Sequence, residues 1–189
     1  MAVISVPAPV IDITISLATL LYRGINPEGG FSMNSADLDI IFRTHGDRTG
    51  VPWQLIKAVA QQESGLDPQV VKTIDKHGMR AIGLMQVTCP SKKIIEGWTG
   101  EEPAEGGCDS LFDPDKNVKM GTDILSWNMT FFGFLRGIAS FNLWTECSSS
   151  PQGPFKNQAY VDSVITTFKQ YRGDVEAATA QYGDGKRSK

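Results

Sequence analysis

The stretch WQLIKAVAQQESGLDP, residues 53–68, predicts an amphipathic helix that ends in an unusual way. Its apolar side chains recur at the spacing that lines one face of an α-helix, and a step of four from Val59 reaches Glu63. The SGLDP that follows stops the helix, so this carboxylate lies at a helix end facing a loop. Burial disfavours the charged form of a carboxylate. Glu63 is therefore a candidate for a raised pKa.

The chain from residue 34 to residue 173 favours a single mainly α domain. Signals for helix starts are Asn34 or Ser35, Pro52 in a first turn, Pro90, and Asp113 with Pro114. The first helix is expected to end in HGDRTG, residues 45–50, and the last, within residues 155–171, is ended by Gly173. Residues 134–142 are expected to be buried. Strand signals are few and no internal repeat is visible, so we expect about six or seven helices.

The charge balance excludes several classes of partner and cofactor. A net charge of −3 gives no electrostatic footprint for nucleic acid, and the basic GKRSK belongs to an expected flexible tail over residues 174–189. His45 and His77 are far from any metal-ligand spacing and are expected on the surface or in loops. We therefore expect no metal and no cofactor. Cys89, Cys108 and Cys147 allow at most one disulfide, whose pairing the sequence leaves open.

Residues 1–33 form the most apolar part of the chain but do not match an export signal. No Lys or Arg precedes Arg23, two prolines interrupt the start, and Asp12 lies in the middle. The run is also too short and too interrupted to span a membrane. Residues 11–18 alternate as in a strand, whereas residues 17–24 could form a helix. We interpret residues 1–33 as an N-terminal arm and linker that docks on the domain or on a partner.

A second polar group in an apolar run accompanies Glu63. AIGLMQVT, residues 81–88, contains one amide, Gln86, between Met85 and Val87. A cleft that holds a buried amide and a carboxylic acid suits a polar, uncharged ligand such as a sugar. The alternative for Glu63 is an ordinary helix-end residue that bonds a neighbour.

Five segments in this order and at these separations resemble the soluble lytic transglycosylase family, which is related to goose-type lysozyme. They are QQESGLDP (61–68), AIGLMQVT (81–88), LFDPDKNVKMGTDIL (111–125), IASFN (138–142) and YVDSVITTF (160–168). The resemblance covers roughly residues 36–172. It implies a lysozyme-like α fold and cleavage of the β-1,4 bond between N-acetylmuramic acid and N-acetylglucosamine in peptidoglycan, with Glu63 as the catalytic residue.

The resemblance also implies how one carboxylate acts. Glu63, kept protonated by burial, would donate to the glycosidic oxygen and then accept the proton of the muramoyl C6 hydroxyl, which yields a 1,6-anhydro sugar. This chemistry relaxes the usual demand for a second carboxylate. Asp67, in a turn, and Asp75, in a loop, are expected to be capping or solvated residues.

Matching positions extend the implied site to substrate-binding residues, each with a plainer alternative. Ser64 follows the acid and could instead cap the helix; Met85 and Gln86 match a turn that lines the sugar groove, although Met85 could be core. Asn142 matches the Asn of an Ala-Tyr-Asn segment. Tyr160 matches a tyrosine that points toward the acid, with packing as its alternative.

The chain departs from the family pattern after Ala139. Phe141 replaces the usual tyrosine, which removes a hydroxyl, and LWTECSSSP, residues 143–151, replaces a small Ala-Gly. Leu143 is interpreted as core or a stacking wall for a sugar ring, and Trp144 as either one. These changes concern the product side of the site.

The odd N-terminus suggests a setting for a wall-degrading enzyme. We expect a virion component of a bacteriophage, delivered to the bacterial periplasm or cell wall, whose arm docks on tail or internal virion proteins. A secreted or periplasmic bacterial enzyme whose signal peptide is missing from this chain is the alternative. Two alternative functions remain: a goose-type muramidase that uses water, and a structural virion protein that keeps the fold without turnover.

Overall fold

The computed structural model describes residues 34–73, 80–89, 107–143 and 152–183. The chain divides into two units, Met1–Asn34 and Ser35–Lys189, and the second carries every element discussed below. The N-terminal arm, the helix expected at Pro90, and the side chains of Asp75, Cys147 and Trp144 lie outside the described residues.

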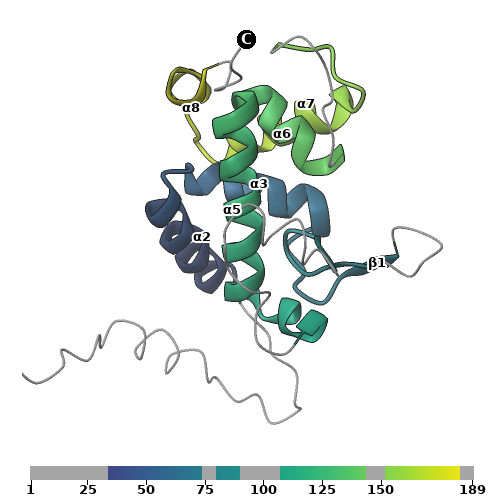
Figure 1. Ribbon diagram of the computed structural model, residues 1–189. Helices are drawn as coiled ribbons and strands as arrows, with labels where there is room; N and C mark the ends of the chain where they lie inside the picture. Colours follow the sequence, from purple (N-terminus) through teal and green to yellow (C-terminus); the bar gives the residue numbers. More distant parts are fainter. Residues whose placement is uncertain (1–33, 74–79, 90–106, 144–151, 184–189) are drawn as a thin grey trace, which may run out of the picture. The chain divides into compact units, whose positions relative to one another are not determined.

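Six α-helices lie in the described residues, which confirms a mainly α domain. They are α2 (Ser35–Thr49), α3 (Trp53–Ser64), α5 (Pro114–Phe132), α6 (Phe134–Leu143), α7 (Gln158–Gln170) and α8 (Val175–Tyr182), with a 3-10 helix η1 (Gly107–Phe112) before α5. The long helix α5 packs against α2 and α6, and α3 packs against α2 and α7 (Figure 1). None of the described helices is long and apolar enough to cross a membrane.

The helix that carries Glu63 begins and ends close to the predicted positions. Pro52 directly precedes α3 instead of lying inside its first turn. At the other end Gly65 adopts a left-handed conformation with φ of 69°, and its N–H donates to Gln61 O at 3.0 Å. Glycine adopts this conformation without the steric cost of a Cβ. The predicted stop after Ser64 is therefore confirmed.

One expectation about residues 45–50 is confirmed and one needs correction. The first helix ends within this segment as expected, because α2 continues to Thr49 and Gly50, with φ of 76°, leaves it. His45 is not a surface or loop residue: it is buried in α2, and its Nε2 lies 2.8 Å from Asp115 Oδ1 on α5. The polar partner satisfies a buried imidazole, so this histidine joins two helices.

The start of α5 follows its predicted cap. Asp113 precedes the helix, its side chain accepts from the N–H groups of Asp115 and Lys116, and Pro114 is the first helical residue. Asp113 thus satisfies donors that the first turn leaves free, and proline needs no partner there. The helix α6 that follows is buried along most of its length, as expected for residues 134–142.

A small sheet lies between α3 and η1 in the sequence. Its strands β1 (Val71–Thr73), β2 (Arg80–Ile82) and β3 (Val87–Cys89) are antiparallel in the order β1-β2-β3. Ile82 pairs with Val87, so residues 83–86 form the turn that joins β2 to β3. Each strand has three residues, which is too short for a clear alternating pattern in the sequence.

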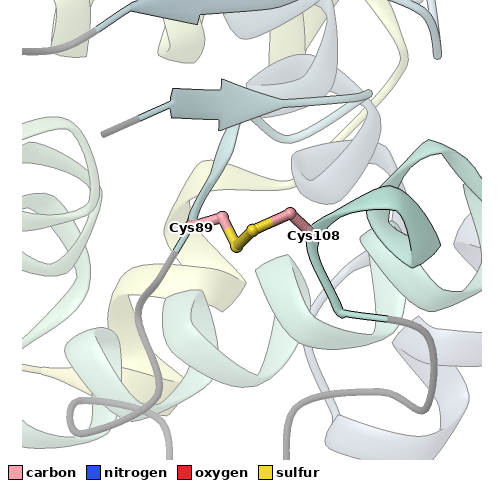
Figure 2. Close-up of a disulfide and its surroundings, with 2 residues drawn as sticks. All are labelled: Cys89 and Cys108. Carbon is pink, nitrogen blue, oxygen red and sulfur yellow. A yellow bond between two sulfur atoms is a disulfide. The ribbon is translucent and has the colours of Figure 1, made fainter. Parts of the chain in front are cut away.

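A disulfide joins Cys89 at the end of β3 to Cys108 in η1 (Figure 2). This resolves the pairing that the sequence left open. The bond closes a loop between residues 19 apart and ties the last residue of the sheet to the segment that leads into α5. It therefore links β3, which lines the site described below, to the segment that precedes α5.

The expected flexible tail is wrong for residues 175–182. These residues form α8, which packs against α6 and α7 through the buried Ala178. Asp174 caps the helix by accepting from the N–H of Ala177. Tyr182 and Gln181 reach the carbonyl of Gly50, so the helix belongs to the domain.

Candidate active site

A pocket of about 310 Å³ opens at the C-terminal end of α3. This volume is at the lower end of the range for small-ligand sites. The lining residues come from α3, all three strands, the turn between β2 and β3, α5 and α6: Glu63, Lys72, Ala81, Met85, Gln86, Val87, Thr88, Ile124, Phe141 and Asn142. The pocket thus gathers segments up to 79 residues apart.

Glu63 lies in this pocket with its carboxyl group partly withdrawn from water. The hydroxyl of Tyr160, on α7, donates to Glu63 Oε1 at 2.7 Å. Burial raises the pKa of Glu63, while the Tyr160 hydrogen bond, the positive charge of Lys72 and a hydrogen bond from Asn142 lower it; burial prevails. A raised pKa keeps more of this group protonated near neutral pH, as a general acid requires.

Tyr160 is held as a hydrogen-bond donor. Burial, together with the charge of Glu63 and the hydrogen bond to it, raises the pKa of Tyr160 well above its usual value. The phenol therefore stays neutral and can donate throughout the physiological range. Its helix packs through Val161, Val164 and Phe168, so the ring is positioned by a buried helix face while its hydroxyl reaches the acid.

The turn between β2 and β3 carries the second predicted group. Gly83 and Gln86 both have positive φ, and a side chain at Gly83 would collide with Asn117. The amide nitrogen of Gln86 donates to the carbonyls of Val70 and Gly83, at 3.1 and 2.9 Å. Its Oε1 is buried without a partner, and so is the hydroxyl oxygen of Thr88 two residues further on. Both residues line the pocket.

Asn117 supports this turn from beneath. Its Oδ1 accepts from Met85 N at 2.8 Å, and its Nδ2 donates to the carbonyls of Ile82 and Leu111, at 2.7 and 2.9 Å. Three buried hydrogen bonds thus connect the start of α5 to the turn, to the end of β2 and to η1. Met85 itself is fully buried and lies against Gly121, so it backs the pocket as part of the core.

The other predicted residues lie in different positions. Asn142 is exposed at the pocket and accepts from Asn157 Nδ2 at 3.1 Å. Ser64 does not line the pocket: its hydroxyl lies 3.1 Å from Ala60 O and 2.9 Å from Leu84 O, in the helix-end role that was its alternative. Phe141, the departure from the family pattern, forms part of the wall.

Glu63 is the one carboxylate among the residues that line the pocket. Asp67 accepts from Gln69 N at 2.8 Å within its own turn, as its sequence context predicted. The described part of the chain holds no cluster of three or more His, Cys, Asp or Glu side chains fit for a metal ion.

Sequence reasoning missed Lys72, Thr88, Asn117 and Asn157. A signal existed for Asn117, which lies four residues before Gly121 on the buried stripe of α5, where a polar residue is as unusual as Glu63 on α3. Lys72 and Thr88 lie in strands too short to show a pattern. Asn157 precedes α7 and acts through Asn142.

A helical domain with one partly buried, hydrogen-bonded glutamic acid in a sugar-sized pocket has the features of an acid-catalysed glycan-cleaving domain. A family model described as the transglycosylase SLT domain matches residues 40–189, so the chain belongs to this family. The family confirms the lytic transglycosylase resemblance and the prediction of an enzyme domain.

A solved structure supports the fold. The chain is similar to an inactive mutant of the lytic transglycosylase Slt from Pseudomonas aeruginosa, with 20% identity and a TM-score of 0.51. The match covers 89% of this chain and 27% of that one, so the present chain corresponds to about a quarter of the longer protein. This similarity confirms the lysozyme-like fold. No curated protein matches the chain.

Proposed function

We propose that this domain cleaves the β-1,4 bond between N-acetylmuramic acid and N-acetylglucosamine in peptidoglycan and leaves 1,6-anhydromuramic ends. The observation that carries the proposal is the pairing of Glu63 with Tyr160 in a pocket that holds no other carboxylate among its lining residues. Membership of the transglycosylase SLT family supports the same reaction.

In the first step protonated Glu63 donates to the glycosidic oxygen, and the bond to the anomeric carbon breaks. The carboxylate that remains is stabilised by the Tyr160 hydroxyl and by Asn142. In the second step this carboxylate accepts the proton of the C6 hydroxyl, whose oxygen attacks the anomeric carbon. Glu63 ends protonated again, so one residue supplies both acid and base.

Hydrolysis by water is the second candidate. An inverting hydrolase needs a base about 6.5–9.5 Å from the acid, and a retaining one needs a nucleophile about 5–5.5 Å away. Glu63 is the one carboxylate among the lining residues of the pocket, so these residues offer neither group. Asp67 is bonded in its own turn. This favours attack by the substrate's own hydroxyl over attack by water.

Mass spectrometry of digested peptidoglycan separates these outcomes. We expect anhydromuramic ends from the native protein; reducing ends would show the muramidase reaction, and no products would show a protein that keeps the fold without turnover. Glu63→Gln is the matched control because it keeps size and hydrogen bonding but cannot donate the proton. Its activity should fall by about 10²- to 10⁴-fold. Activity above about a tenth of the native value would refute Glu63 as the acid.

We propose further that a phage particle carries the enzyme and that residues 1–33 dock it there. Support for this setting comes from the sequence of the arm alone: its alternating residues 11–18 and its Gly-containing linker. The secreted or periplasmic enzyme is the competing setting. The truncation described in the Discussion tests this proposal.

A further inference from the structure

Lys72 lies at the pocket beside Glu63, although the two belong to different elements. Lys72 is on β1, and its Nζ donates to the main-chain carbonyl oxygen of Glu63 at 2.5 Å. Both side chains line the pocket. The lysine therefore bonds the backbone of the acid, and its positive charge also acts on the acid's carboxyl group.

The end of α3 explains why this bond matters for position. The last carbonyls of a helix have no partner inside the helix, and a cation near them is favourable. No basic residue lies in the last turn of α3, and the cap at Gly65 uses the carbonyl of Gln61. Lys72 thus supplies from β1 the cation that α3 lacks, and it does so at the carbonyl of Glu63 itself.

The groups around the Glu63 carboxyl come from three other elements. Tyr160 of α7 donates to Oε1, Asn142 of α6 bonds the carboxyl, and Lys72 of β1 contributes positive charge. Lys72 is the one cation among the residues that line the pocket. Its ammonium bonds the main-chain carbonyl, so the lysine bond does not occupy a carboxyl oxygen.

We propose that Lys72 is a positioning residue that holds the main chain of Glu63 and stabilises the carboxylate formed when the proton leaves. The inference rests on the proposed function, in which the proton passes from Glu63 to the glycosidic oxygen and returns from the C6 hydroxyl. Burial alone would make Glu63 a weak acid, and a nearby positive charge offsets part of that effect. Water screens an exposed lysine, so the expected contribution is moderate.

Titration of Glu63 by NMR, with ¹³C-labelled glutamate carboxyl groups, tests this directly. The Glu63→Gln variant identifies the signal. Lys72→Met removes charge and donor, Lys72→Gln keeps a donor without charge, and Lys72→Arg keeps both; Lys169→Met, in the last turn of α7, is the matched control. We expect both neutral variants to raise the pKa of Glu63 by about half a unit or more. Lys72→Arg and Lys169→Met should titrate as the native protein does.

The proposal is overturned if Glu63 in both neutral variants has the same pKa as in the native protein. If Lys72→Met fails to fold, Lys72→Gln decides alone. The pH profile of peptidoglycan cleavage gives a second readout. The alkaline limb should move to higher pH in Lys72→Gln, because Glu63 keeps its proton longer, and it should stay in place in Lys72→Arg. If the Lys72 variants shift the pKa of Glu63 but the native protein forms no glycan products, the proposed function is refuted while the Lys72–Glu63 coupling is supported.

Discussion

The chemistry of Glu63 depends on opposing influences on one proton. Burial favours the protonated acid, whereas Tyr160, Lys72 and Asn142 favour the carboxylate. A catalyst that must both give and take a proton needs both states to be accessible, since efficiency is greatest when the pKa is near the working pH. The apolar face of α3 supplies the burial, and partners from α7, β1 and α6 supply the offset.

The raised pKa of Glu63 predicts a pH-dependent gain in stability for Glu63→Gln. A group whose pKa is higher in the folded state contributes stability below its unfolded pKa, about 4.3 for glutamate. That contribution is lost as the pH rises through the folded pKa. Relative to the native protein, the variant should therefore gain in free energy of unfolding between about pH 4 and pH 7. Urea unfolding at both pH values measures the difference, and a constant difference would contradict the raised pKa.

Tyr160→Phe should reduce peptidoglycan cleavage while changing the free energy of unfolding only a little. The change removes the hydroxyl that donates to Glu63 Oε1 but keeps the ring on its helix. The free energy of unfolding should fall by at most about 1–2 kcal/mol, as for one hydrogen bond. In the native protein this bond lowers the pKa of Glu63, so its loss should raise that pKa. The alkaline limb of the pH profile should therefore move to higher pH. Tyr171→Phe, at the end of the same helix, is the control; native lysis by Tyr160→Phe would make Tyr160 a packing residue.

Among the elements, α5 both lines the pocket, through Ile124, and supports its wall from the first turns of the helix. Its first turn is capped by Asp113, and one turn later Asn117 bonds the β2–β3 turn, which presents Gln86 and leads into β3 with Thr88. The disulfide at Cys89 ties the end of β3 to the same region (Figure 2). Helix and sheet therefore act as one support for the wall of the pocket that carries Gln86 and Thr88.

Asn117→Ala should disrupt the site as well as the fold. It leaves the N–H of Met85 and the carbonyls of Ile82 and Leu111 without their partner, at a cost of about 3 kcal/mol or more. Peptidoglycan cleavage should fall with it, because the turn loses its anchor. Asp113→Ala weakens the same helix start by about 1 kcal/mol without touching the turn and should keep its activity. Urea unfolding and lysis assays compare the two; equal losses of activity would contradict a specific role for Asn117.

For the molecule as a whole, the chain separates at residues 34 and 35. The family model begins at residue 40, and α2 begins at Ser35. The catalytic unit thus contains α2, the pocket and α8.

A chain that starts at Ser35 should fold and cleave peptidoglycan about as well as the full-length protein. The lining residues in the described part of the chain all belong to the second unit, and this supports the expectation. Under the docking proposal the truncated chain should fail to enter phage particles, whereas the full-length chain should be incorporated. Thermal unfolding provides the control. A truncated chain that is insoluble or much less stable would make the arm part of the enzyme's own core.

Local sequence patterns were enough to predict several helix boundaries and the apolar face that carries the acid. The apolar spacing of α3, its stop at Gly65 and the cap at Asp113 are properties of a few consecutive residues, because helix periodicity and capping act within one or two turns. The same spacing drew attention to Glu63. The ordered segments that resemble the transglycosylase family then predicted Tyr160 as its partner.

Contacts between distant segments needed the folded chain. Tyr160 and Glu63 are 97 residues apart and only the family resemblance linked them, whereas nothing in the sequence linked Asn117 to Met85, 32 residues away, or Lys72 to the acid on another element. The pairing of Cys89 with Cys108 and the docking of α8 through Ala178 are of the same kind. Such contacts depend on how helices pack, and no periodicity within one segment encodes the neighbour it will meet. The sequence therefore predicted the acid, and packing supplied most of the groups that control its proton.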